Sequence, residues 1–376
     1  RLFGMAFHVD YAVCVIVMAV LTGVYVIAGG YMATAINDFI QGIIMIFGIC
    51  AVIAAVMQAE GGLSQALLRL AQVSDPAASP APGAFTSFFG PDPLNLAGVV
   101  VLTSLGTWGM PQMVQKFYAI RSEKAIDKGT IISTVFAAIV AGGCYFLGGF
   151  GRLFSDQVDV AANGYDSIVP TMLEGLSTVL IAVVVILVLS ASMSTLSSLV
   201  LASSSTLTLD FIKDTIVKDM DEKRQILTMR LLIMVFIAIS VVLAIVQYRS
   251  NVTFIAQLMG VSWGALAGAF LAPFLYGLYW KKTTRGACWV NFLFSTVVML
   301  ANIFFGKYFP TLLQSPINAG AFCMLAGLII VPVVSLVTPR LPQGQIDRIF
   351  ACYDRKVVVS VKDSIGDHTN PKEETP

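Results

Sequence analysis

Histidine and charge are scarce in this sequence. Its two histidines, His8 and His368, lie near the chain ends, so a catalytic triad or a zinc site built on histidine is nearly excluded. Charged residues make up 12% of the chain, whereas an ordinary soluble domain has about 25%. The net charge of +1 implies no nucleic-acid partner. The cysteines lack a CxxC pair, which indicates small core residues and no disulfide or metal framework; they are Cys14, Cys50, Cys144, Cys288, Cys323 and Cys352.

Apolar residues dominate what remains, at 57% of 376 residues with a mean hydropathy of +0.83. Length alone would suggest two soluble domains, but this composition predicts an all-α polytopic membrane protein. A helix crosses the lipid core with about 20 apolar residues. The absence of ten-residue polar and apolar alternation argues against a membrane β-barrel. Nine suitable stretches occur, near 11–33, 38–58, 94–114, 129–150, 174–208, 226–247, 253–279, 286–306 and 318–338.

The basic residues predict an orientation in the plasma membrane. One set of loops carries twelve Lys and Arg residues and the other set five, before the tail that starts at Arg340. Since Lys and Arg concentrate in cytoplasmic loops, we expect the N-terminus outside and the C-terminus in the cytosol. We expect residues 1–340 to form the transmembrane domain and 341–376 a disordered cytoplasmic tail. The chain begins RLFGMAFHVDYA, and we interpret it as a fragment that has lost N-terminal helices; the alternative is that processing creates this end.

Hydroxyl groups are concentrated in one apolar helix, at ASMSTLSSLVLASSS, residues 191–205. Residues three and four apart share a helix face, so the Ala191 carbonyl is within reach of the Ser194 and Thr195 hydroxyls. Three neutral oxygens form a partial cage for a small hard cation such as sodium, and a neutral cage also releases its ion. One turn along, Ser197 and Ser198 offer a second pair of hydroxyls. The alternative is that these side chains bond back to their own helix or allow close helix packing.

Asp38 is the clearest carboxylate placed against an apolar span, in TAINDFIQGIIMIFG. An intramembrane carboxylate is costly and usually faces a partner or a water path. The alternatives are that Asp38 reaches the cytoplasmic interface or caps a helix N-terminus.

Two apolar stretches are interrupted by glycine and proline, TSLGTWGMP at 103–111 and GVSWGALAGAFLAP at 260–273. Such interruptions in membrane helices point to the central site or hinge of a transporter, although glycine is also a packing residue. Trp108 and Trp263 lie within these stretches. Each could stack on a substrate or fill core volume.

Three segments together resemble the sodium:solute symporter family, and specifically its proline and pantothenate branch. They are ATAINDFIQGIIM, GMPQMVQKFYAIRSEKAIDKG and the serine-rich segment from Ala191 to Asp210. The resemblance runs from about residue 9 to 340. It implies the five-plus-five inverted-repeat transporter fold, in which the nine helices correspond to core helices four to ten and two C-terminal helices. Four N-terminal helices of the family pattern, including the first core helix, are then missing.

The resemblance also implies roles for particular positions. The principal sodium site corresponds to Ala191, Ser194 and Thr195. The second sodium site that some members have corresponds to Asp38, Ser197 and Ser198. For the substrate pocket or hinge we select Thr103, Thr107, Trp108, Pro111, Trp263 and Gly264. Proline-carrying members have aromatic residues where Thr103 and Thr107 stand, so the solute stays open between an amino acid such as proline and a carboxylate such as pantothenate.

The expected function is sodium-coupled import of a small organic solute by alternating access, with Na⁺ as the coupling ion. Since a ligand shifts an equilibrium only by its differential affinity for two states, sodium and solute must strengthen each other's binding. One alternative is a proton-coupled transporter of the same fold, in which Asp38 titrates. Another is a membrane sensory module. A membrane enzyme is disfavoured because no catalytic cluster appears at membrane depth. Membrane lipid is an expected partner, and the oligomeric state is left open.

Overall fold

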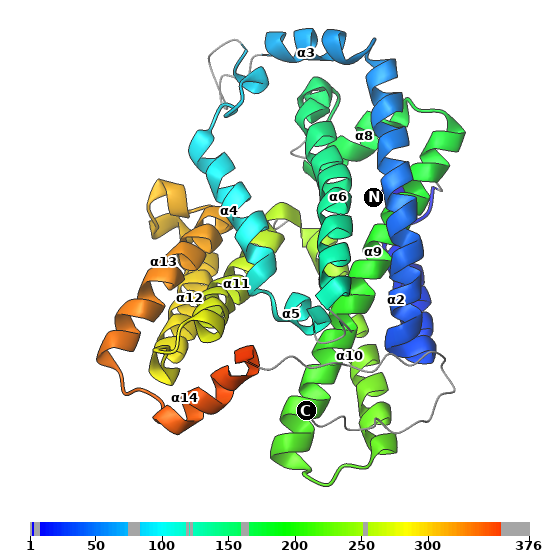
Figure 1. Cartoon of the computed structure of the whole chain (residues 1–376). Helices are drawn as coiled ribbons and strands as arrows, with labels where there is room; N and C mark the ends of the chain where they lie inside the picture. Colours follow the sequence, from blue (N-terminus) through cyan, green and yellow to red (C-terminus); the bar gives the residue numbers. More distant parts are fainter. Residues whose placement is uncertain are drawn as a thin grey trace.

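The computed structural model describes residues 2–3, 8–73, 83–117, 120, 123–158, 165–250 and 255–354. Over these ranges the chain is helical and contains no strand. Long helices run alternately up and down between two ends (Figure 1). We call the end at which α3 lies the upper end and the end at which α14 lies the lower end. The elements are α2 (Tyr11–Ala59), α3 (Leu63–Gln72), η1 (Ala84–Thr86), α4 (Pro93–Gly109), α5 (Pro111–Phe117), α6 (Glu123–Gly149), η2 (Phe150–Gln157), η3 (Tyr165–Ser167), α8 (Ile168–Glu174), α9 (Thr178–Thr206), η4 (Leu207–Ile216), α10 (Glu222–Ser250), α11 (Ile255–Tyr279), α12 (Arg285–Phe305), η5 (Gly306–Tyr308), η6 (Thr311–Leu313), α13 (Pro316–Val337), α14 (Gln343–Phe350) and η7 (Ala351–Asp354).

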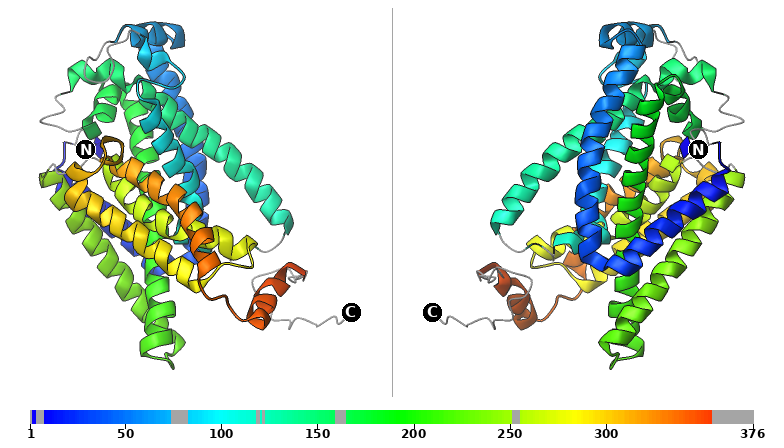
Figure 2. Two further views of the ribbon diagram at one scale, coloured as in Figure 1. Left: turned by 90° about the vertical axis from the view of Figure 1, so that its left-hand side faces the viewer. Right: turned by 90° about the vertical axis from the view of Figure 1, so that its right-hand side faces the viewer.

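The first long helix, α2, is bent into two limbs that meet towards the lower end (Figure 2). The limbs, Tyr11–Gly29 and Thr34–Ala59, are each long and apolar enough to cross a membrane. The sequence predicted two separate spans here, 11–33 and 38–58. The structure confirms two spans and joins them in one bent helix.

Asp38 lies inside the second limb of α2, in its second turn. The N-cap of α2 is Asp10, whose side chain accepts a hydrogen bond from the Ala12 amide at 2.8 Å. The hypothesis that Asp38 caps a helix N-terminus is therefore wrong, because the helix already runs through that position.

The break predicted within 103–111 is confirmed. α4 ends at Gly109, and Met110 is extended, with φ −84° and ψ 121°. Pro111 then begins the short helix α5. Proline lacks an amide N–H and disfavours helical backbone in the residue before it, so the chain leaves the α4 axis at Met110. α5 packs against α9 and so links the two halves of the helix bundle.

The hydroxyl-rich segment lies in α9, whose bounds differ from the predicted 174–208. α9 begins at Thr178, after the turn that follows α8, and its course continues as the π-helix η4 to Ile216. α9 packs against both α2 and α10. Their shared core contains Val26, Val200 and Ile233.

The break predicted within 260–273 is wrong, because α11 is one continuous helix that contains Pro273. Its glycines serve close packing instead. A Cβ atom on Gly264 would lie 2.6 Å from the Gly320 Cα atom of α13, and one on Gly268 would lie 2.9 Å from the Cys323 Cβ atom. Small residues of this kind allow membrane helices to approach each other closely.

Buried polar side chains connect α11 to its neighbours. Asn291 of α12 donates to the carbonyl oxygens of Gly268 and Ala269 at 3.0 and 2.9 Å. Ser295, one turn further along α12, donates to the Gly264 carbonyl at 3.3 Å. Together with the glycine contacts, these bonds hold α11, α12 and α13 as one group.

Eight helices of the described ranges are long and apolar enough to cross a membrane. The predicted ninth span, 94–114, corresponds to α4 and α5, of which α4 has 17 residues before the break. The chain is thus a multi-pass membrane protein. The α9–α10 and α11–α12 connections, which are rich in Lys and Arg, lie at the lower end with α14 (Figure 2).

The start of the expected disordered tail is helical. Residues 343–350 form α14, and 351–354 form the 3-10 turn η7. Disorder was therefore the wrong expectation for these residues. Residues 355–376 lie outside the described part of the chain.

Candidate functional site

Two hydroxyls of α9, those of Ser194 and Thr195, share one backbone carbonyl, as the sequence predicts. Ser194 Oγ donates to the Ala191 carbonyl at 3.1 Å, and Thr195 Oγ1 donates to the same oxygen at 2.9 Å. A carbonyl four residues earlier is the usual partner of a Ser or Thr side chain in a membrane helix. Both side chains therefore bond back to their own helix, which is the alternative that the sequence left open, and a role of the three oxygens in binding sodium stays a prediction.

Ser194 and Thr195 line a cavity of about 620 Å³, which we call the α6-side cavity. Its walls come from the second limb of α2 and from α5, α6, α9 and α11. Gln112 lines it directly after the break between α4 and α5, and Trp263 of α11 also lines it. The predicted cation site thus faces a space large enough for a small solute.

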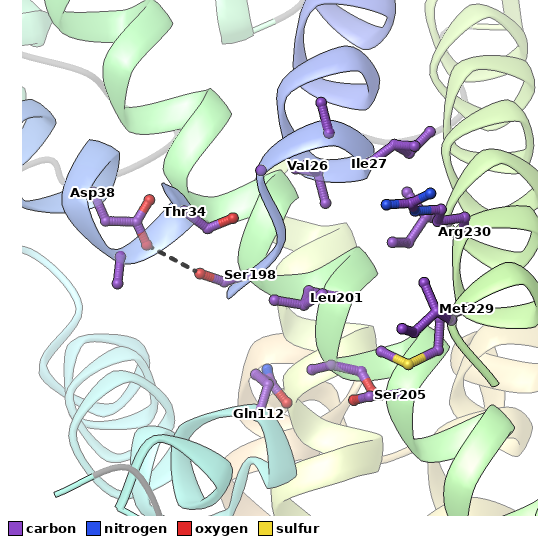
Figure 3. Close-up of a pocket in the computed structure, with 16 residues that line it drawn as sticks. Val26, Ile27, Thr34, Asp38, Gln112, Ser198, Leu201, Ser205, Met229 and Arg230 are labelled. Carbon is purple, nitrogen blue, oxygen red and sulfur yellow. Dashed lines mark hydrogen bonds between the residues drawn. The ribbon is translucent and has the colours of Figure 1, made fainter. Parts of the chain in front are cut away.

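A carboxylate stands beside these hydroxyls. Ser198 Oγ donates to Asp38 Oδ2 at 3.5 Å, at the long limit of a hydrogen bond, and so connects α9 to α2 (Figure 3). Asp38 is half-buried. Asp38, Gln112 and Ser198 line the α6-side cavity and also a second cavity of about 680 Å³. These residues form the boundary between the two spaces.

The second cavity, which we call the α10-side cavity, lies between the bend of α2 and the helices α9 and α10. Figure 3 shows Arg230 of α10 on the opposite side of this cavity from Asp38. Thr34 and Ser205 add hydroxyl groups to its wall. The cavity therefore combines an acidic side, a basic side and neutral polar groups.

The two serines predicted for a second sodium site are placed differently. Ser198 faces Asp38, whereas Ser197 is fully buried and donates to the Ser194 carbonyl at 2.9 Å. Ser197 lines neither of the two cavities. The structure thus brings together Asp38 and Ser198 of the predicted set, and the second sodium site stays a prediction.

The residues predicted for a substrate pocket or hinge are spread over several environments. Trp263 lines the α6-side cavity, Gly264 packs against α13, and Pro111 begins α5. Thr103 and Thr107 donate to carbonyls of their own helix, those of Val99 at 2.8 Å and Ser104 at 3.0 Å. Trp108 is 62% exposed, so it does not fill core volume within this chain.

Three polar residues of the site were missed by sequence reasoning. Tyr25 donates from its hydroxyl to the Met193 carbonyl at 3.1 Å and ties α2 to the hydroxyl-rich turn of α9. Gln112 and Arg230 line the cavities described above. Gln112 directly follows the predicted break and Arg230 interrupts an apolar run, so the sequence could have indicated both as polar residues of a site. The sequence offered no such indication for Tyr25.

Neutral oxygens are the main candidate ligands here. Within the part of the chain that the structure describes, no group of three or more His, Cys, Asp and Glu residues could hold a metal ion. A sodium ion prefers hard oxygen ligands, and hydroxyl and carbonyl groups provide them. The donor set at Ala191, Ser194 and Thr195 fits that chemistry.

A bundle of long apolar helices, with one broken helix and cavities that Asp38, Gln112 and Ser198 help to line, defines a multi-pass membrane protein. The chain belongs to the sodium:solute symporter family, which it matches over residues 1–293. The predicted family is therefore confirmed.

Two relatives illustrate this membership. The chain is 28% identical over 348 residues to a sodium/proline symporter of Staphylococcus aureus, covering 91% of this chain and 64% of the relative. It is 25% identical over 292 residues to a sodium/pantothenate symporter of Haemophilus influenzae, covering 75% and 56% of the two chains. The chain thus spans less than two thirds of the length of these relatives.

A solved structure shares the fold. It is a Na⁺-coupled sialic acid symporter in a substrate-bound outward-open state, with a TM-score of 0.67 and 16% sequence identity. The match covers 89% of this chain and 69% of that one. This similarity confirms the predicted five-plus-five inverted-repeat transporter fold.

Proposed function

We propose that this protein is a sodium-coupled symporter that imports a small organic solute by alternating access. The observation that carries the proposal is the grouping of the Ala191, Ser194 and Thr195 oxygens beside a cavity that also contains Asp38. Family membership supports it, since the relatives named above are sodium symporters for proline and pantothenate.

For the principal sodium site we propose the Ala191 carbonyl with the hydroxyls of Ser194 and Thr195. Both hydroxyls now donate to that carbonyl, so each must turn its proton away for its oxygen to face the ion. A hydroxyl rotates freely about its C–O bond, which makes this rearrangement small. A neutral site holds sodium weakly enough to release it into a cytosol that is poor in sodium.

For a second sodium site we propose Asp38, Ser198 and Ser197. The first two are already adjacent, at 3.5 Å. Ser197 would join them by changing from one staggered rotamer to another, which breaks its bond to the Ser194 carbonyl. The two sites lie on adjacent turns of α9, so an ion in one changes the conformational freedom of the other.

The solute we propose is a carboxylate or amino acid bound at the cavities between Trp263 and Arg230. Proline, pantothenate and sialic acid, which the relatives named above carry, all have a carboxylate group. Arg230 is the one cation among the residues that line the α6-side and α10-side cavities. A guanidinium group pairs with a carboxylate through two parallel hydrogen bonds.

The conformational step in this proposal uses the break at Met110. The helix group α11–α13 and the group α2, α9 and α10 are linked through α5, so they can tilt relative to each other there. We also propose that the lower end, with its basic connections and α14, faces the cytosol of the cell whose plasma membrane holds the protein.

Uptake into proteoliposomes tests this function. The protein, expressed from its full reading frame, is reconstituted and given labelled proline, pantothenate or sialic acid with an inward gradient of sodium or of choline at fixed pH. We expect uptake of one solute in sodium and not in choline. Uptake driven by a proton gradient without sodium would instead make Asp38 the titrating group and overturn sodium coupling. A sodium-specific thermal shift without uptake of any of the three would overturn the choice of solutes.

A further inference from the structure

A third cavity, of about 470 Å³, lies at the lower end between the α11–α12 connection and α14. It shares no lining residue with the α6-side or α10-side cavity. We call it the α14 cavity. Its position and chemistry differ from those of the transport site, so it calls for a separate explanation.

α14 covers one side of this cavity and has two unlike faces. Ile346 is 7% exposed, and it lines the cavity together with Ile349 and Phe350. Asp347 and Gln343 bond to each other at 3.0 Å on the exposed part of the same helix. Figure 1 shows α14 near the lower ends of α12 and α13, whereas α9 and α10 extend further down. A short helix of this pattern is typical of the plane of a membrane interface.

Contacts from the neighbouring segments fix α14 in place. The Tyr353 hydroxyl, just after α14, donates to the Leu278 carbonyl at the end of α11 at 2.8 Å. The Lys281 Nζ atom lies 5.5 Å from the centroid of the Phe350 ring, which is within the range of a cation–π interaction. The wall that α14 provides is therefore held by specific contacts, and the Lys281 ammonium group lies at the edge of the cavity.

The lining residues divide into an apolar floor and a basic rim. The floor includes Phe270, Pro273 and Phe292, and the rim includes Lys281 and Arg285. No Asp or Glu is among the residues that line this cavity. An occupant must therefore combine an apolar part with a negative charge.

The tryptophans that line the α14 cavity indicate that it lies at a membrane interface. Trp280 and Trp289, two of the four tryptophans in the chain, both line the cavity, and tryptophan gathers at the boundary between lipid and water. Arg285 begins α12, and Trp289 follows it by about 6 Å along the helix axis at a rise of about 1.5 Å per residue. Trp289 is 64% exposed on a membrane-spanning helix, so the cavity opens towards lipid.

We propose that the α14 cavity binds an anionic phospholipid of the cytoplasmic leaflet. The phosphate and headgroup contact Lys281 and Arg285, and an acyl chain packs against Phe270 and Phe292. This occupant satisfies the charge, the apolar floor and the opening towards the bilayer together. It also explains why α14 folds back onto the α11–α12 connection.

Native mass spectrometry tests the proposal by counting lipid adducts. The protein is released from nanodiscs of phosphatidylcholine with or without phosphatidylglycerol, as wild type and as the double variant Lys281→Gln/Arg285→Gln. The control is Lys223→Gln/Arg224→Gln, which removes the same two charges from the other basic connection at the lower end. We expect phosphatidylglycerol retention to fall about 30-fold in the first variant, since each cation near an anionic surface contributes about 1 kcal/mol and about 1.4 kcal/mol corresponds to tenfold. The control should bind as wild type does, and equal losses in both variants would overturn a specific site.

Fluorescence quenching locates the lipid independently of charge. In the background Trp108→Phe/Trp263→Phe, the remaining tryptophans are Trp280 and Trp289, both at the α14 cavity. Phosphatidylglycerol with brominated acyl chains should quench them more strongly than brominated phosphatidylcholine does, and equal quenching would overturn the preference for an anion.

Discussion

The Ser198 hydroxyl lies 3.5 Å from the Asp38 carboxylate, although 160 positions separate the two residues in the chain. This contact joins α9 to the second limb of α2 at the boundary between two cavities. The hydroxyl-rich turn and the intramembrane carboxylate, which the sequence presents as separate features, therefore lie together in the folded chain.

Removing the hydroxyls of the proposed principal site should weaken sodium binding. Sodium at 100 times its Kd stabilises the folded state by about 2.7 kcal/mol. We expect Ser194→Ala and Thr195→Ala each to weaken sodium affinity about tenfold and so remove about half of that gain. The measurement is the Tm in sodium against equal potassium. Ser203→Ala, an exposed hydroxyl of the same helix, is the control, and an unchanged sodium shift in both site variants would remove the proposed site.

Neutralising the carboxylate at Asp38 should change sodium coupling more than folding. Asp38→Asn keeps the shape of the side chain and its contact with Ser198, but it loses the charge that favours a second ion. We expect a lower ratio of sodium to solute in flux measurements, or a higher sodium concentration for half-maximal uptake. If the variant only accumulates at a lower level and couples as wild type does, Asp38 has a structural role.

Replacing Arg230 should impair recognition of a carboxylate solute. Hydrogen bonds to charged groups contribute about 1.5 to 3 kcal/mol, so Arg230→Gln should raise the KM for the transported carboxylate about tenfold or more. Arg224→Gln, at the start of the same helix α10, is the control. Competition by the methyl ester of the solute provides a second measurement. An ester that competes as well as the acid does in wild type would show that Arg230 does not bind a carboxylate.

Adding one methyl group at Gly264 should destabilise the α11–α13 contact. The new Cβ atom would lie 2.6 Å from the Gly320 Cα atom, so backbone must move. We expect Gly264→Ala to lower the free energy of unfolding by about 1 to 3 kcal/mol. Gly277→Ala in the same helix meets nothing within 4 Å and should be neutral or stabilising by up to about 1 kcal/mol. Thermal unfolding in detergent compares the two, and equal stabilities would show that the contact is not close-packed.

Composition and apolar length were sufficient to predict most of the fold. A helix that crosses the lipid core needs a run of about 20 apolar residues, and such runs can be recognised in the sequence. The break at Met110 was also predictable, because Pro111 acts on its immediate neighbour. The grouping of Ser194 and Thr195 around Ala191 followed from helix geometry alone.

The errors arose where one local pattern serves two purposes. Glycines in 260–273 indicate a break or a packing face equally well, and the structure shows an unbroken helix with Gly320 opposite Gly264. Neighbouring residues in a helix point about 100° apart, so only the packed structure shows that Ser198 rather than Ser197 faces Asp38. α14 was missed because its apolar face is completed by α11 and α12.

The bonds from Asn291 and Ser295 to the carbonyls of α11 have a mechanical consequence. Each bond joins a side chain of α12 to a particular turn of α11, so axial sliding of one helix along the other would break all of them together. Domain movements proceed by shear between packed helices or by rotation about a hinge. These bonds therefore oppose shear between α11 and α12 and favour rotation of the two helices as one body.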